Sequence, residues 1–278
     1  MWLLNDGRLK LVWRILIFIC FLLLAIAPLI IINNSLLQFI GATFILLYGL
    51  YLNSKYLDKR PMSDYGIVFS KKTFIHLLNG ISIGSLSVIA IFLIGKITGI
   101  LLVTEPLVPS IDVWGLLLFA IKMLFVATLE EAFFRGYLFT TIYDGFSTKR
   151  GFQNKAVVIG AVVSSVLFGL AHIGNSYASV LSISFLSING VVWCIPFILT
   201  KNLGLSIGLH AAWNFAQTQV GFTMSGNEPV KSLFIIENKG PDLWTGGEYG
   251  PEAGLLGLIG FAIMLSLSLI YLNSKRRI

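Results

Sequence analysis

Three short motifs, L-E-E-A-F-F-R-G-Y, F-G-L-A-H and H-A-A-W-N, place polar side chains inside long apolar stretches of the chain. Their charged or hydrogen-bonding members are Glu130, Glu131, Arg135, His172, His210 and Asn214. Ionisable residues within membrane-spanning segments are costly and usually functional. These side chains are therefore the first candidates for chemistry.

Helical spacing separates the two adjacent glutamates. Glu131 and Arg135 are four residues apart, so they share a helix face in the favourable order of Glu before Arg. Glu130 points about 100° away from Glu131 around the same helix. The spacing predicts that Glu131 and Arg135 form a supporting ion pair, whereas Glu130 is free to react.

The remaining polar residues complete a plausible site for amide hydrolysis. A carboxylate shielded from water, such as that of Glu130, is suited to accept a proton from a water molecule. His172 can share that water, while His210 and Asn214 are donors of the kind that stabilise an oxyanion. The same side chains could instead hold a divalent metal such as zinc, so the sequence leaves a metal-dependent and a metal-independent mechanism equally open.

Simpler interpretations exist for each of these residues. The Glu131–Arg135 pair could fix helix packing with Glu130 as a spectator, and a histidine near a helix end often bonds only a backbone carbonyl. The occurrence of all three motifs together favours a common site. Lys122, eight residues before Glu130, has no partner that the spacing identifies. Two cysteines within apolar segments, Cys20 and Cys194, are expected to serve only packing.

The elements that must position these residues are membrane-spanning helices. Of 278 residues, 56% are hydrophobic and only 12% are charged, against roughly a quarter charged in soluble domains. We predict an all-α membrane protein, a single domain over residues 1–278 with a polar catalytic cavity inside the bundle and a catalytic core at about 113–220. The eight expected spans are 11–32, 35–52, 76–95, 113–135, 156–172, 178–199, 203–220 and 254–272.

The distribution of basic residues predicts the orientation of these spans. Fifteen Lys and Arg residues fall on the side of the two termini and three on the other, with Lys122 and Arg135 inside the fourth span. This bias predicts a multi-pass protein of the cell membrane with both termini in the cytoplasm. The basic residues form no nucleic-acid motif, so the expected partners are the lipid bilayer and a protein or peptide substrate.

These boundaries create a conflict between two candidate residues. Span four would carry Glu130 in its cytoplasmic half, whereas span five would carry His172 near its exterior end. For the two side chains to meet, a boundary must shift or a helix must be broken or re-entrant.

The ordered motifs E-E-x-x-x-R, F-x-x-x-H and H-x-x-x-N on successive apolar segments resemble the CPBP family. This family comprises type II CAAX prenyl endopeptidases and bacteriocin-processing or immunity-type membrane proteins. The resemblance implies an eight-helix intramembrane endopeptidase. In it, Glu130 and His172 would activate water, and His210 with Asn214 would stabilise the oxyanion. Family members are described both as metalloproteases and as metal-independent glutamate proteases.

The sequence therefore predicts an endopeptidase that cleaves peptide bonds in or near the bilayer. The alternative is a non-catalytic immunity or scaffold protein that binds a peptide or a partner enzyme in the same cavity. An ion-coupled or proton-coupled transporter is disfavoured because the sequence has no repeat symmetry and no matched pair of broken helices.

Overall fold

The structure, a computed structural model, describes residues 8–105, 112–147, 153–229 and 232–276. Four of the basic residues used to predict the orientation, Lys149, Arg150, Lys231 and Arg277, lie outside the described residues.

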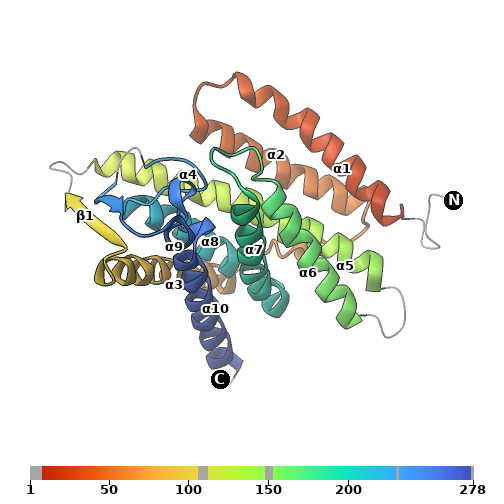
Figure 1. Ribbon diagram of the computed structural model, residues 1–278. Helices are drawn as coiled ribbons and strands as arrows, with labels where there is room; N and C mark the ends of the chain where they lie inside the picture. Colours follow the sequence, from red (N-terminus) through yellow and green to blue (C-terminus); the bar gives the residue numbers. More distant parts are fainter. Residues whose placement is uncertain (1–7, 106–111, 148–152, 230–231, 277–278) are drawn as a thin grey trace.

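Helices make up most of the described chain, so the predicted all-α class is confirmed (Figure 1). The long helices are α1 (Leu11–Ile26), α2 (Ser35–Tyr56), α3 (Lys71–Ile97), α4 (Val113–Glu131), α6 (Gln153–Leu170), α7 (Val180–Thr200), α8 (Gly204–Gln219) and α10 (Leu255–Arg276). The shorter helical elements are η1 (Ala27–Ile31), η2 (Met62–Tyr65), η3 (Ala132–Phe139), α5 (Thr140–Ser147), α9 (Asp242–Thr245), η4 (Gly247–Tyr249) and η5 (Pro251–Ala253).

Seven of the described helical segments are long and apolar enough to cross a membrane, judged by length and composition. The predicted span at 203–220 is also helical, but α8 has only 16 residues and is not among the seven. Nearly every α8 residue is buried by the surrounding helices. Apolar side chains such as Leu24, Ile30 and Phe44 are exposed on the outer helices. Such an outer surface fits contact with lipid, because lipid tails give no penalty to exposed apolar groups.

The fourth span is longer than predicted. Helix α4 continues without a break through the π-helix η3 into α5, so one helical segment runs from Val113 to Ser147. In Figure 1 this segment crosses the width of the molecule. The predicted end at residue 135 is wrong because Gly136, which directly follows, stays helical and packs against the backbone of Tyr65 instead of ending the helix. The residues from Arg135 to Thr141 are all buried. Glu130 consequently lies at the midpoint of the segment.

Helix α8, which carries two candidate residues, is held by close backbone packing against α3. Each helix contains a G-x-x-x-G pattern, Gly80 and Gly84 in α3 and Gly204 and Gly208 in α8. A Cβ atom at Gly84 would lie 2.6 Å from the carbonyl oxygen of Leu209. Small residues of this kind let two membrane helices approach closely.

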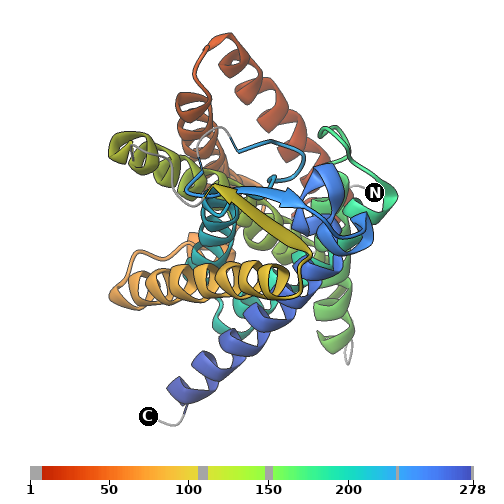
Figure 2. The same ribbon diagram turned by 60° about the vertical axis from the view of Figure 1, so that its left-hand side comes forward.

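Two loops also fold back on the bundle. Strand β1 (Leu101–Glu105) pairs antiparallel with β2 (Ile235–Asn238), with Leu102 opposite Glu237 and an irregularity before Glu105. Figure 2 shows this pair lying across the helices. The segment after α8, predicted only as an exterior loop, is therefore structured over its described residues.

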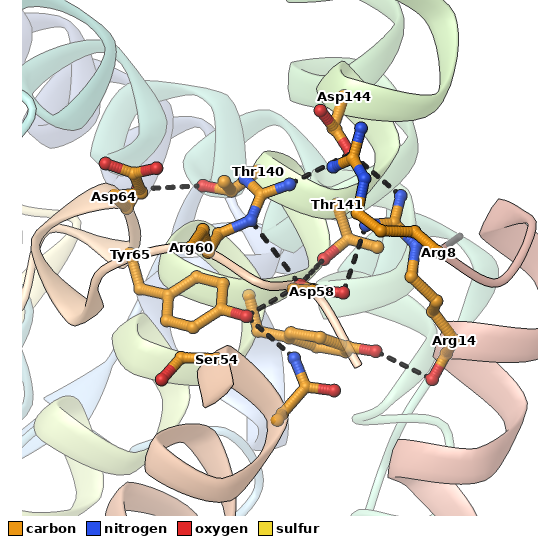
Figure 3. A network of polar contacts seen from close by, with 12 residues as sticks. Arg8, Arg14, Ser54, Asp58, Arg60, Asp64, Tyr65, Thr140, Thr141 and Asp144 are labelled. Carbon is orange, nitrogen blue, oxygen red and sulfur yellow. Dashed lines mark hydrogen bonds and ion pairs between the residues drawn. The ribbon is translucent and has the colours of Figure 1, made fainter. Parts of the chain in front are cut away.

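A buried polar network joins the ends of α1, α5 and the α2–α3 connection (Figure 3). Arg14, fully buried, contacts Asp58 at 3.0 Å and Asp144 at 2.9 Å. Asp144 also receives Arg8 at 2.8 Å and Arg60 at 2.9 Å. The sequence analysis interpreted these arginines only as topology signals. Their ion pairs with Asp58 and Asp144 instead connect three segments of the chain inside the protein.

Tyr65 extends the network toward the centre of the bundle. Its hydroxyl donates to Asp58 at 2.6 Å and accepts from the Asn53 amide at 2.7 Å. Burial, together with the neighbouring Asp58 carboxylate, raises the pKa of Tyr65 well above its usual range, so the phenol keeps its proton. On the π-helix, Tyr137 donates to the carbonyl oxygen of Arg14 at 2.9 Å. The network is thus linked to the segment that carries Arg135.

Candidate active site

A cavity of about 1420 Å³ opens along one face of α4. All four predicted catalytic residues, Glu130, His172, His210 and Asn214, line it. They come from three places in the fold: the end of α4, the turn after α6, and α8. The conflict between Glu130 and His172 is resolved because the long α4–α5 segment places Glu130 at its midpoint, while His172 follows the end of α6.

The two glutamates approach the imidazole of His210 from its two nitrogens. Nδ1 of His210 lies 2.9 Å from Oε1 of Glu131, and Nε2 lies 3.7 Å from Oε2 of Glu130. The Glu131 side chain is fully buried, whereas that of Glu130 is 22% exposed. The predicted separation of the glutamates on the helix is therefore present, but Glu131 has a second partner, His210, that helical spacing within one motif could not reveal.

Arg135 forms the ion pair expected from its spacing. Its Nη1 lies 3.0 Å from Oε1 of Glu131, and both side chains are fully buried. Nη2 donates to the carbonyl oxygen of Gly190 in α7 at 3.0 Å, and the guanidinium lies 4.5 Å from the ring centroid of Phe168. Arg135 therefore holds Glu131 in place and connects η3 to α6 and α7.

Aromatic rings fix the plane of the His210 imidazole. The indole of Trp193 stacks on it, with ring centroids 3.9 Å apart and an interplanar angle of 14°. Phe168 meets it edge-on at 6.0 Å. With Nδ1 bonded to Glu131 as well, the ring has one orientation, and its Nε2 is directed toward Glu130.

His172 is oriented by its own motif. Its Nδ1 lies 2.8 Å from the carbonyl oxygen of Phe168, the other end of the F-x-x-x-H motif. A carbonyl oxygen only accepts, so Nδ1 carries the proton, and in the neutral ring Nε2 is an acceptor. The four-residue spacing that suggested a shared face thus determines the tautomer of His172.

Glu252 is an acidic residue of the cavity wall that the sequence analysis missed. It is 2% exposed, and its carboxylate accepts from the indole of Trp213, the amide of Gln217, and both the backbone N–H and the hydroxyl of Ser225. These bonds attach the segment after α8 to α8 itself. No motif marks Glu252, because its partners become neighbours only when this segment folds back.

The side-chain arrangement does not fit a metal centre. Within the described ranges, no group of three or more His, Cys, Asp and Glu side chains could hold a metal ion. Nδ1 of His210 and Nδ1 of His172 are both engaged by protein oxygen atoms. Cys20 is exposed and Cys194 is buried, and both are free thiols. The described side chains therefore offer no complete ligand set for a metal ion.

Comparison with known proteins gave one match. The family model described as type II CAAX prenyl endopeptidase Rce1-like matches residues 112–216. This segment includes all three motifs and all four predicted catalytic residues. No curated protein and no solved structure gave a significant match. The match agrees with the suspected family: residues 112–216 of this multi-pass membrane protein match the Rce1-like family of type II CAAX prenyl endopeptidases.

Proposed function

We propose that the protein is an intramembrane endopeptidase that hydrolyses peptide bonds of membrane-associated proteins or peptides, with Glu130 as general base. The observation that carries the proposal is the position of the Glu130 carboxylate. It borders a large cavity, and its Oε2 atom, buried and without a hydrogen-bond donor among the described residues, faces Nε2 of His210 at 3.7 Å.

Glu130 and His172 would activate the attacking water. The Glu130 carboxylate takes a proton from water as the oxygen attacks the peptide carbonyl carbon, and it later returns that proton to the leaving amine as the C–N bond breaks. Because Nδ1 of His172 donates to Phe168, Nε2 of His172 is the acceptor that can hold the second hydrogen of the water.

His210 and Asn214 would stabilise the oxyanion. Since Nδ1 of His210 is engaged by Glu131, its Nε2 can donate only when the ring carries two protons. A doubly protonated His210 would make the set of Glu130, Glu131, Arg135 and His210 neutral overall. Neutrality suits a site with a low dielectric, where an uncompensated charge is expensive. The amide of Asn214, four residues further along α8, would supply the second donor.

Peptide cleavage by the purified protein tests this proposal. We expect wild-type protein in detergent to cleave members of a mixed peptide library, and Glu130→Gln to lose about 100-fold or more of that activity, since general bases contribute roughly 10²–10⁴-fold. The Gln variant is nearly isosteric. It should therefore give the same melting temperature as wild type, which separates loss of chemistry from loss of fold.

Two further comparisons complete the experiment. Activity that persists with a chelator would agree with the absence of a metal-holding side-chain group among the described residues. Full activity in Glu130→Gln would refute the proposal. If wild type binds peptides in the cavity but cleaves none, the non-catalytic immunity or scaffold alternative is supported instead.

A further inference from the structure

The helix bundle has two distinct ends, which the contacts between the helix connections define. The polar network of Figure 3 lies at one of them, which we call the network end. The α7–α8 connection lies there too, because the N–H of Leu203 donates to the carbonyl oxygen of Gly66, in the α2–α3 connection, at 3.1 Å. The hydroxyl of Tyr271, near the end of α10, lies 3.1 Å from Nδ1 of His76, near the start of α3. The end of α10 therefore belongs to the same group.

The opposite ends of the helices meet at what we call the mouth end. Asn175, in the turn after α6, donates to the carbonyl oxygen of Ser225, in the segment after α8, at 3.0 Å. The N–H of Lys239 donates to the carbonyl oxygen of Ile100, just after α3, at 2.8 Å. The ends of α3, α6 and α8 are thus joined there by the segments that follow them.

The cavity occupies the half of the bundle nearest the mouth end. In α8 its lining begins at His210 and continues to Gln219, the last residue of that helix. In α1 it is lined by Leu22 and Ile26, from the last two turns of the helix, and in α6 by Phe168, again near the end. Each of these three helices runs toward the mouth end, so the lining residues gather on one side of the molecule.

Polar residues at the mouth end show where the cavity meets water. Asp112, Asn227 and Glu228 line the cavity, and all three are exposed. Exposed carboxylates are costly within the hydrocarbon region of a membrane. This part of the cavity wall therefore faces water rather than lipid, and the cavity has an aqueous opening at the mouth end.

Dense packing separates the cavity from the network end. Tyr65, Tyr137 and Phe139 are buried between the cavity and the network. A Cβ atom at Gly136 would lie 2.9 Å from the carbonyl oxygen of Tyr65, so the α4–α5 segment and the α2–α3 connection are in direct contact. Among the described residues, none of the network lines the cavity. A peptide therefore has no path from the network end to Glu130 in this conformation.

The basic residues indicate which end faces the cytoplasm. On the described chain the network end has twelve Lys and Arg residues, and the mouth end has two, Lys96 and Lys239. Lys122 and Arg135 lie within the α4–α5 segment. An excess of Lys and Arg marks the cytoplasmic side of a membrane protein. The twelve residues fall within 8–14, 55–72, 155, 201 and 275–276.

We infer that the cavity opens to the extracytoplasmic side of the membrane and is closed to the cytoplasm. Its substrates are proteins or peptides whose cleaved segment enters from that side, and the polar ends released by hydrolysis leave there. This inference rests on the proposed function, because it assigns a side of the membrane to the substrate of the same site. The opening itself does not depend on catalysis.

Cysteine labelling in intact cells tests the opening without any turnover. The parent is Cys20→Ser, which should not react because the remaining Cys194 is fully buried. Leu129→Cys is the probe of the cavity, Glu237→Cys is the control at the mouth end, and Lys72→Cys is the control at the network end. The reagent is a small, positively charged methanethiosulfonate that does not cross membranes.

In intact cells Leu129→Cys and Glu237→Cys should react, whereas Lys72→Cys should react only after the membrane is permeabilised. Thr218→Cys, on the cavity wall formed by α8, repeats the measurement if Leu129→Cys does not accumulate. Labelling of Lys72→Cys in intact cells would overturn the inference, as would reaction of the cavity cysteine only from the cytoplasmic side. A cavity cysteine that reacts only in detergent, or not at all, would also overturn it, because the cavity would then be closed to both sides.

Membrane vesicles of the two orientations test the side from which peptide is cleaved. The probe is a peptide that the protein cleaves in detergent, extended by a polar tail so that it does not cross the membrane. We expect cleavage with right-side-out vesicles and its loss with inside-out vesicles, restored by detergent, with Glu130→Gln vesicles as the background. The reverse pattern would overturn the inference. If no peptide is cleaved even in detergent, but the cavity cysteine reacts in intact cells, the proposed function fails while the extracytoplasmic opening stands.

Discussion

Removal of Arg135 should destabilise the whole bundle. Arg135 and Glu131 are both fully buried, 3.0 Å apart, and Arg135 also donates to Gly190 across the helix interface. Arg135→Met keeps much of the side-chain volume but leaves the Glu131 carboxylate in the interior without its cation. His210 would remain its only charged or polar partner among the described residues.

The expected cost is about 3 to 5 kcal/mol, the range measured when one partner of a buried ion pair is removed. This is a large fraction of the roughly 5–15 kcal/mol that stabilises an ordinary domain. We therefore expect Arg135→Met to accumulate poorly in membranes and to melt well below wild type in detergent.

A double variant separates the buried charge from the lost packing. Adding Glu131→Gln to Arg135→Met removes the unpaired carboxylate, while the Gln oxygen can still accept from Nδ1 of His210. The double variant should regain about half or more of the lost stability. Glu130→Gln is the matched single control. The Glu130 side chain is 22% exposed, and its contact with His210 is longer, 3.7 Å. The Glu130→Gln variant should therefore accumulate as wild type does.

Two measurements test this prediction: the unfolding of the purified variants in detergent and their accumulation in membranes. The reasoning is refuted if Arg135→Met accumulates and melts as wild type does. A double variant that is less stable than Arg135→Met would also contradict it, because the penalty could not then come from the unpaired Glu131.

Two further predictions follow from the packing of α8. Gly84→Ala would place a Cβ atom 2.6 Å from the carbonyl oxygen of Leu209, so overpacking should lower the free energy of unfolding by about 1–3 kcal/mol. In the control Gly174→Ala the new Cβ atom meets nothing within 4 Å, so this variant should melt at the wild-type temperature. Glu252→Gln should replace an acceptor of the Ser225 N–H by a competing donor, so amide hydrogen exchange around Ser225 should accelerate about tenfold or more. The exposed Glu237→Gln serves as its control, and unchanged exchange at Ser225 in Glu252→Gln would contradict the role assigned to Glu252.

Helical periodicity and composition were enough to predict the fold class, most of the spans and the polar motifs. The Glu131–Arg135 pair and the orientation of His172 by Phe168 depend on contacts four residues apart within one stretch of chain. Such contacts follow from the pitch of a helix alone. The sequence could also exclude the soluble classes, since so few of its residues are charged.

Other features depended on contacts between segments far apart in the chain. The helical segment containing Glu130 continues past Gly136 to Ser147 because its distal part is buried by other helices, and the local sequence does not reveal that burial. Arg14 lies inside a network with Asp58 and Asp144, although its sequence context suggested only a topology signal.

The sequence by itself predicted which residues are candidates for the reaction, because residue type and helical spacing are local properties of the chain. Only the tertiary structure decided that His210 lies between the two glutamates, that Glu252 holds a loop to the cavity wall, and that Lys122 shares the cavity with Glu130. The physical reason is that each of these arrangements depends on how separate helices and loops pack, and a one-dimensional pattern contains no information on the distance between them.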